Sequence, residues 1–458
     1  MTKVNMDSDR KLNLLRTFLV YVSFTGIGSG MVVLGSSILD LQIQVKSDFQ
    51  STSKIIPTRA AGLIVGYFLA GLIGDRINLQ VLMFLANAFT GLAFMSAPWN
   101  HTLVGLLIDF FISGIFLATN KVCCNTFIFS IWGKNSMVYL QLLYSCYDIG
   151  SFLTPFFIKP FLLPIKRDIK HVEESANITD DGYYHGPYTA ADVKVQYPIM
   201  ITGSFFMLTS IGFLLLHFFY PYTKSMEHSA LEKKESGGES KNKSLKWLII
   251  ILMALFTHCA QSTTDLIGEM GPSFAVMSDL KLTKETGVTL VSVFWGTFTS
   301  YRLVFLLFLM FTSADRAKML NVILLIASVI ILTPHASHNE TSLWVGVVLL
   351  GFGFCPLFAA TYGSLSKYFT VTSKLTSSFF LSSCFGRLVY PLIVGHYLNS
   401  MPIIFIYTIA ALTISACILT LIIPVVGNRY LESGRKDENL KSKKLESGQN
   451  DQEFSPTK

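Results

Sequence analysis

Apolar stretches about as long as a membrane-spanning helix follow one another along most of this chain. A helix needs roughly 20 apolar residues to cross the hydrocarbon core of a bilayer, whereas the strands of an outer-membrane barrel are about half that length and alternate in polarity. With 51% hydrophobic and only 14% charged residues among 458, the chain is also too apolar for a soluble protein of this size. The sequence therefore predicts an all-α membrane protein embedded in a lipid bilayer.

Six apolar stretches precede a polar segment, and six more follow it. The polar segment is rich in Lys, Glu, Ser and Gly and offers little to bury, which is typical of a disordered linker. The predicted parts are a cytoplasmic tail at 1–13, a six-helix bundle at 14–220, a disordered cytoplasmic linker at 221–246, a second six-helix bundle at 247–426 and a disordered cytoplasmic tail at 427–458. This organisation predicts twelve transmembrane helices.

The two halves repeat a few features in the same relative helices. Asp75-Arg76 and Asp315-Arg316 both follow the second helix of a half, and a Gly and a Pro recur in each fifth helix at Gly150, Pro155, Gly386 and Pro391. The repetition indicates two pseudo-symmetric bundles, an architecture in which the halves rock around a central site.

The distribution of basic residues predicts the orientation of the chain. If both termini are cytoplasmic, Lys and Arg gather in the inside loops, and the outside loops between helices 3 and 4, 9 and 10, and 11 and 12 contain neither. This is the positive-inside pattern, and spreading over short loops argues against a nucleic-acid partner. The same orientation places the sequon Asn177-Ile-Thr outside, so we predict glycosylation of Asn177 and a plasma-membrane location.

Two charges lie in apolar helices on either side of the connection Gly133–Ser136. Lys121 precedes that connection by about ten residues and Asp148 follows it by about twelve, so both lie at similar depth. An ionised side chain there is costly unless it faces a partner or a polar pathway. Two interpretations stay open: a mutual ion pair between neighbouring helices, or a substrate or ion pathway.

Four further charged residues lie within the spans. Asp265 is our first candidate for a ligand of a cation or of a solute rich in hydroxyl groups, such as a sugar, because a carboxylate accepts two hydroxyl hydrogens at once. Alternatively, Asp265 and Glu269 lie in water at the mouth or close a gate with Arg59. Together with Lys121 and Asp148, Arg302 and Arg387 would give the centre of the membrane portion a net charge of roughly +2. Such a charge favours a small organic anion as an alternative substrate. Either arginine could instead pair with Asp148 or a helix end.

Several stretches resemble the major facilitator superfamily, and within it the sodium-dependent glucose transporter branch, which is related more distantly to the bacterial fucose permease. The matching stretches are the Gly-x-x-x-Asp-Arg loop at Gly71 to Arg76, Gly35 to Leu41, Ile131-Trp-Gly through Leu140 to Gly150 and Pro155, Lys159 to Leu162, and Phe294 to Phe298 with Arg302. The resemblance covers most of the membrane portion but not the linker or the tails. It implies a carrier for a hexose-like sugar, with coupling to Na⁺ or H⁺.

The chain departs from this branch at the two central charges. The branch carries an acid four residues before an Asn in helix four, and a glycine before Ile149-Gly150 in helix five. Here Lys121 stands at the acid position before Asn125, and Asp148 stands at the glycine position. An ammonium repels Na⁺ and cannot coordinate it. The pair could act as a proton switch or as a fixed bridge in a uniporter, so the resemblance supports sugar better than sodium.

The remaining candidates are aromatic and gating residues. Tyr144, Tyr147 and Trp295 could stack on a sugar face, although single aromatic residues in such a chain more often serve packing. The candidate gating residues are Asp75, Arg76, Gln141, Asp315, Arg316 and Arg387. The loop pairs among them present charges at helix ends, where they can part when the bundles rock.

No enzyme motif, phosphate-binding loop or metal-ligand spacing occurs in the sequence, so we predict no catalysis, no metal and no cofactor. Nothing in the sequence requires an oligomer. A different class stays open beside the transporter, namely a carrier-like receptor or scaffold that has lost transport together with the acid replaced by Lys121.

Overall fold

A computed structural model of the chain describes residues 2–73, 77–133, 136–164, 188–222, 243–311, 314–333, 335–365, 368 and 373–453. The predicted linker lies almost wholly outside these ranges, as do Asp75, Arg76 and the sequon residue Asn177.

The described residues are almost entirely helical and form two sets of long helices. The first set consists of α1 (Thr2–Val45), α3 (Ile55–Ile73), α4 (Leu79–Ser96), α5 (Leu103–Trp132), α6 (Ser136–Ile158) and α7 (Gln196–Phe219). Three short helices adjoin them: α2 (Phe49–Ser53), η1 (Ala97–Trp99) and η3 (Lys159–Phe161).

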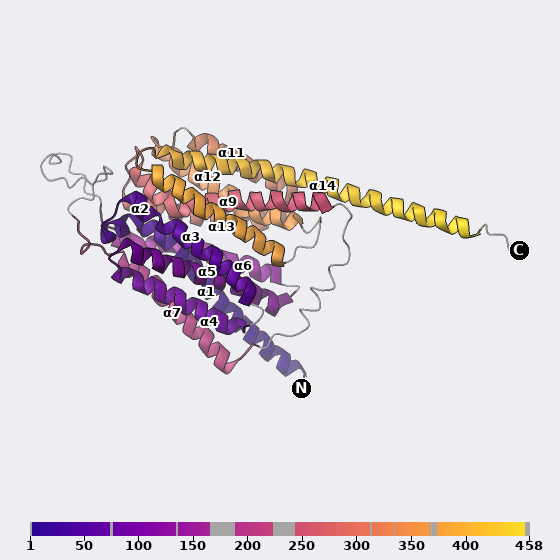
Figure 1. Cartoon of the computed structure of the whole chain (residues 1–458), viewed down its shortest axis with the longest axis horizontal. Helices are drawn as coiled ribbons and strands as arrows, with labels where there is room; N and C mark the ends of the chain where they lie inside the picture. Colours follow the sequence, from indigo (N-terminus) through magenta and orange to yellow (C-terminus); the bar gives the residue numbers. More distant parts are fainter. Residues whose placement is uncertain are drawn as a thin grey trace.

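The second set comes from the later half of the chain. It consists of α9 (Lys243–Met277), α10 (Lys284–Phe311), α11 (Ala314–Leu332), α12 (Glu340–Leu365), α13 (Ser373–Tyr397) and α14 (Ile403–Glu453). Figure 1 shows the early helices, indigo to magenta, packed beside the later ones, rose to yellow. We call the two sets the N bundle and the C bundle.

Both ends of the chain lie on the same side of the paired bundles. Helix α1 begins and α14 projects outward on that side (Figure 1). We call it the proximal side and the opposite one the distal side. Nine of the described helices, joined in places to a short neighbour, are long and apolar enough to cross a membrane. The long helices outside that set, α6, α10 and α11, contain charged residues such as Asp148, Arg302 and Lys318. The all-α membrane fold is therefore confirmed, while the number of twelve crossings stays a prediction.

Glycines at equivalent places in the two halves make close contacts with a neighbouring helix. A Cβ at Gly150 in α6 would clash with the carbonyl oxygen of Thr25 in α1, and one at Gly386 in α13 would clash with Ser262 in α9. Because only glycine allows helices this near, both fifth helices approach the first helix of their bundle in the same way. The repeated glycines of the sequence thus correspond to repeated packing.

Helix α1 continues beyond the predicted end of the first span, through residues expected in a polar loop. Its last turns are buried because their polar side chains have partners. Gln44 donates through Nε2 to the carbonyl oxygen of Asn100 at 2.9 Å, and the backbone N–H of Leu163 donates to Asp40 at 2.9 Å. Hydropathy counts these residues as polar, but their hydrogen bonds let them stay buried.

Both predicted tails are helical where the structure describes them. The disorder predicted for 427–458 is wrong as far as Glu453, because α14 continues to that residue. Helix α1 likewise begins at Thr2, inside the predicted tail at 1–13. The physical reason is that elongating an existing helix avoids the unfavourable nucleation step, and the Lys, Glu and Leu of these segments are good helix formers.

Candidate functional site

Asp148 and Arg302 join the two bundles near the middle of the membrane portion. Asp148 is on α6 and Arg302 on α10, and Arg302 Nη2 lies 2.8 Å from Asp148 Oδ2. Both side chains are largely buried, at 4% and 16% exposed. The mutual ion pair between Lys121 and Asp148 is therefore wrong. Asp148 reaches an arginine of the other bundle, as one of the alternatives held.

Lys121 instead places its ammonium between aromatic rings. Its Nζ lies 5.5 Å from the ring centre of Tyr147 on α6 and 5.3 Å from that of Phe380 on α13. Both distances are typical of cation–π contacts. Phe380 belongs to the C bundle, so Lys121 also lies at the interface between bundles.

The predicted aromatic residues cluster around Lys121. Tyr147 packs edge-on against Trp295 of α10 with ring centres 5.9 Å apart. Tyr144 donates its hydroxyl to Oδ1 of Asn125 at 3.2 Å, and Asn125 donates through Nδ2 to the carbonyl oxygen of Lys121 at 2.8 Å. The structure thus brings these five predicted site residues together at the bundle interface, and we call them the central cluster.

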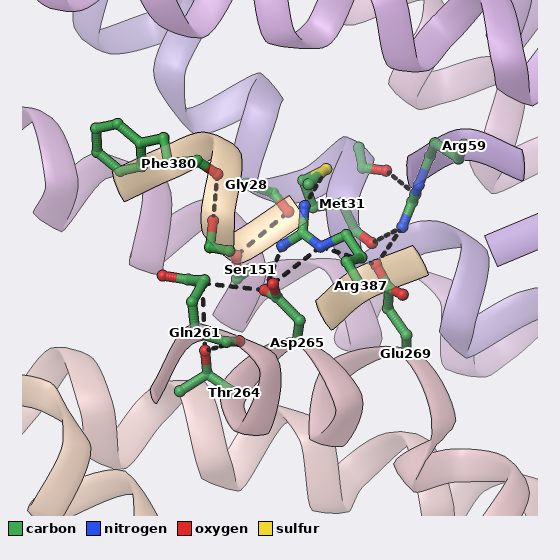
Figure 2. A network of polar contacts seen from close by, with 12 residues as sticks. Gly28, Met31, Arg59, Ser151, Gln261, Thr264, Asp265, Glu269, Phe380 and Arg387 are labelled. Atoms are coloured by element: carbon green, nitrogen blue, oxygen red, sulfur yellow. Dashed lines mark hydrogen bonds and ion pairs between the residues drawn. The ribbon is translucent and has the colours of Figure 1, made fainter. Parts of the chain in front are cut away.

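Asp265 of α9 and Arg387 of α13 face one another within the C bundle (Figure 2). Arg387 Nε donates to Asp265 Oδ2 at 2.9 Å, and its Nη2 contacts Oδ1 of the same carboxylate. Gln261 also donates to Asp265, at 3.0 Å. Both oxygens of Asp265 are therefore engaged, and its role as a sugar ligand stays a prediction.

Arg59 and Glu269 form a second ion pair beside that one, and it crosses between the bundles. Arg59 Nη2 lies 2.6 Å from Glu269 Oε1. The guanidinium is fully buried and also donates to the carbonyl oxygens of Gly30 and Met31, each at 3.0 Å. Glu269 is 3% exposed, so it does not lie in water. Of the alternatives for Glu269, the contact with Arg59 is the one that the structure forms (Figure 2).

A third cross-bundle pair, between Asp40 and Lys284, escaped sequence reasoning. Lys284 Nζ contacts Asp40 Oδ1, and both side chains are buried. Asp40 lies in the stretch Gly35 to Leu41, which resembles the glucose transporter branch, and Lys284 is the first residue of α10. The sequence does place an acid and a base just beyond the predicted ends of two spans. Because 244 residues separate them along the chain, nothing in the sequence indicated that they form a pair.

The other predicted gating residues lie towards the proximal side. Gln141 on α6 is half-buried, and its backbone carbonyl accepts a hydrogen bond from Ser145. Arg316 is exposed near the start of α11, and Asp315 precedes it there with a side chain outside the described part. Their role as gate locks stays a prediction.

The arrangement closes the distal half of the bundle interface. Two buried ion pairs, Asp40 with Lys284 and Arg59 with Glu269, join N bundle to C bundle there. Gly35 of α1 also approaches α9 so closely that a Cβ would clash with the backbone of Glu269. Buried charges that lose a partner are costly, so parting the two bundles on the distal side would cost free energy. In the described part of the chain, no three His, Cys, Asp or Glu lie together as a metal site would need.

Comparisons with known proteins agree with this geometry. No protein-family model matches the chain. The chain is 24% identical over 413 residues to sodium-dependent glucose transporter 1A of Mus musculus, covering 87% of this chain and 94% of that protein. It is 21% identical to major facilitator superfamily domain-containing protein 4A of Xenopus tropicalis, covering 85% and 87%.

The fold also matches that of a solved transporter. The crystal structure of a D-xylose–proton symporter superposes with a TM-score of 0.64 at 10% sequence identity, covering 89% of this chain and 97% of that one. Two repeated bundles, ion pairs between them and relatives over nearly the whole chain point to one assignment. This chain is a multi-pass membrane protein that has the fold of these transporters and is similar in sequence to proteins of the major facilitator superfamily.

Proposed function

We propose that this protein carries a hexose-like sugar across the membrane by alternating access. The central cluster is the observation that carries the proposal, because it places aromatic faces and polar groups at the interface of two repeated bundles. Aromatic rings stack on the apolar face of a pyranose, while amide and hydroxyl groups bond its hydroxyls. The named relatives include sodium-dependent glucose transporters, which supports the same substrate class.

Alternating access requires contacts that close one side and can part. The buried pairs Arg59–Glu269 and Asp40–Lys284 fit that role on the distal side, because each joins one bundle to the other through side chains alone. The N bundle and the C bundle come from one chain, so the transport cycle needs no second copy of the protein.

The rival substrate, a small organic anion, was expected to bind at Arg302 and Arg387. Each of these guanidinium groups contacts a carboxylate, Asp148 and Asp265 respectively. Such pairing neutralises the charge that would attract an anion. The sugar proposal therefore takes precedence over an anion held by those two arginines.

Counterflow of labelled glucose into proteoliposomes with the purified full-length chain tests the proposal. The assay is run with Na⁺, with choline in its place, and with varied outside pH. Saturable exchange establishes a hexose carrier, and its response to Na⁺ or pH identifies a coupling ion, whereas indifference to both identifies a uniporter. Exchange of organic anions but of no sugar would refute the proposal. Folded protein that exchanges no solute would favour the receptor or scaffold alternative.

We further propose that both termini face the cytoplasm, that the protein lies in the plasma membrane, and that Asn177 is glycosylated. The supporting observation is the gathering of Lys and Arg in the loops of one side. Substituting Asn177→Gln should abolish the mobility shift produced by a glycosidase, while Asn242→Gln in the predicted linker should leave it. The opposite result would invert the orientation.

A further inference from the structure

Among the described residues, Lys121 makes no ion pair within contact distance, although the Asp265 carboxylate, which is paired with Arg387, is near enough to influence its charge. Between residues 14 and 426, five acidic residues lie more than one turn inside a described helix, namely Asp40, Asp109, Asp148, Asp265 and Glu269. Each contacts another group in the structure. Four of them meet basic residues other than Lys121, and Asp109 accepts hydrogen bonds from Ser96 and Asn100.

The contacts of Lys121 are of a kind that a ligand can join. The described helices hold no sixth acid at such a position between residues 14 and 426, and the ammonium meets the faces of Tyr147 and Phe380. Aromatic faces attract a cation but accept none of its three N–H bonds in the way that a carboxylate does. The amino group is therefore left with hydrogen-bonding capacity that the described side chains do not use.

A second unused donor lies against the same tyrosine. Trp295 is 4% exposed, and its indole N–H makes no hydrogen bond within the described residues. Trp295 and Lys121 both contact the ring of Tyr147. Buried donors normally have partners, so two unused donors around one ring indicate a place where a ligand supplies the acceptors.

The geometry points to a substrate that is a monosaccharide with a carboxylate group. We propose that the carboxylate binds Lys121, while the sugar ring lies against the aromatic residues of the central cluster and accepts a hydrogen bond from Trp295. A monocarboxylate balances the single positive charge. A phosphate monoester, with a charge of about −1.5 to −2 at neutral pH, would leave excess negative charge in the interface. This inference rests on the proposed function, and it names the class of sugar.

Competition between two nearly identical sugars tests the assignment. D-Glucuronate and D-glucuronamide share their ring and hydroxyl groups and differ in the charge of one group. Each is added as an unlabelled competitor to counterflow of labelled D-glucose with the full-length chain. A hydrogen bond between charged groups should let glucuronate compete at a concentration about tenfold to a hundredfold lower than glucuronamide.

Variants assign the preference to Lys121. Lys121→Gln should remove the preference for glucuronate, whereas Lys121→Arg should retain most of it. Lys159→Gln is the matched control, because Lys159 lies exposed at the start of η3, just after α6, and donates to the hydroxyl of Thr289 in the C bundle at 3.4 Å. If Lys121→Gln does not fold, the comparison of the two sugars on the natural chain still decides.

The outcomes separate this inference from the proposed function. If glucuronamide competes as well as glucuronate or better, Lys121 does not recognise a carboxylate, and the inference is wrong while the hexose carrier stands. A preference that survives Lys121→Gln also overturns it. If folded protein shows no saturable counterflow of labelled glucose, the proposed function itself fails.

Discussion

Replacing Glu269 by Gln should open the distal side of the protein. Arg59 is fully buried in the closed arrangement, and its guanidinium lies 2.6 Å from the carboxylate of Glu269. The substitution keeps the size of the side chain and removes its charge. The closed state then holds a buried guanidinium against a neutral amide, whereas the open state lets water solvate it.

The magnitude follows from the cost of leaving a buried charge without its partner. Breaking a buried pair by removing one charge costs about 3–5 kcal/mol. Gln can still accept a hydrogen bond from Arg59, which reduces the loss to about 2–3 kcal/mol. Since about 1.4 kcal/mol is a factor of ten, the ratio of open to closed molecules should rise roughly 30-fold to 150-fold.

Modification of an introduced cysteine measures that ratio. Ser36 is buried on α1 beside Gly35, where α1 meets α9, and Ser36→Cys changes little in size. A membrane-impermeant thiol reagent is applied from the distal side, and the chain without Ser36→Cys supplies the background from native cysteines. The modification rate should rise by the factor given above when Glu269→Gln is added.

A control and a refuting outcome complete the design. Glu340→Gln is the matched control, because Glu340 is exposed at the start of α12 and accepts a hydrogen bond from Trp344 at 3.0 Å. It should leave the rate unchanged. An unchanged or slower rate in Glu269→Gln would refute the role of the pair in holding the distal side closed.

Three further predictions concern other parts of the interface and the bundles. Gly150→Ala should lower the free energy of unfolding by about 1–3 kcal/mol, and with it the melting temperature, because its Cβ would clash with the backbone of Thr25. Gly71 has open space around it, so Gly71→Ala should leave the melting temperature unchanged. Asp148→Asn should slow exchange and destabilise the protein, because it leaves the charge of Arg302 without a partner. Adding Arg302→Met should restore part of the stability. If the stability losses of the two substitutions simply add, the two residues do not act as a pair. Tyr144→Phe should weaken sugar affinity by up to about tenfold without loss of folded protein, since it removes only the hydroxyl that binds Asn125, and unaltered half-saturation would place Tyr144 outside the site.

Hydropathy could predict the fold class and the two-bundle organisation, because both depend on lengths of apolar sequence and on repetition. The choice of partners could not be predicted in this way. Asp148 lies close in sequence to Lys121, yet it pairs with Arg302, since the crossing of α6 and α10 brings that arginine to it. Lys121 is directed to Phe380 for the same reason. These contacts depend on the rotation of each helix about its axis, which a single sequence leaves undetermined.

The glycine contacts and the ion pairs have different physical tasks in this molecule. Within each bundle, Gly150 and Gly386 let helices approach until one backbone meets the next helix, so the contact depends on shape and cannot slide without clashes. Between the bundles, Arg59–Glu269 and Asp40–Lys284 act through side chains that water can solvate once they part. A rigid contact inside each half and an exchangeable contact between the halves are what a rocking motion requires. Gly35 is consistent with this division, because its close approach to α9 joins the bundles by packing alone and can separate without breaking a hydrogen bond of its own.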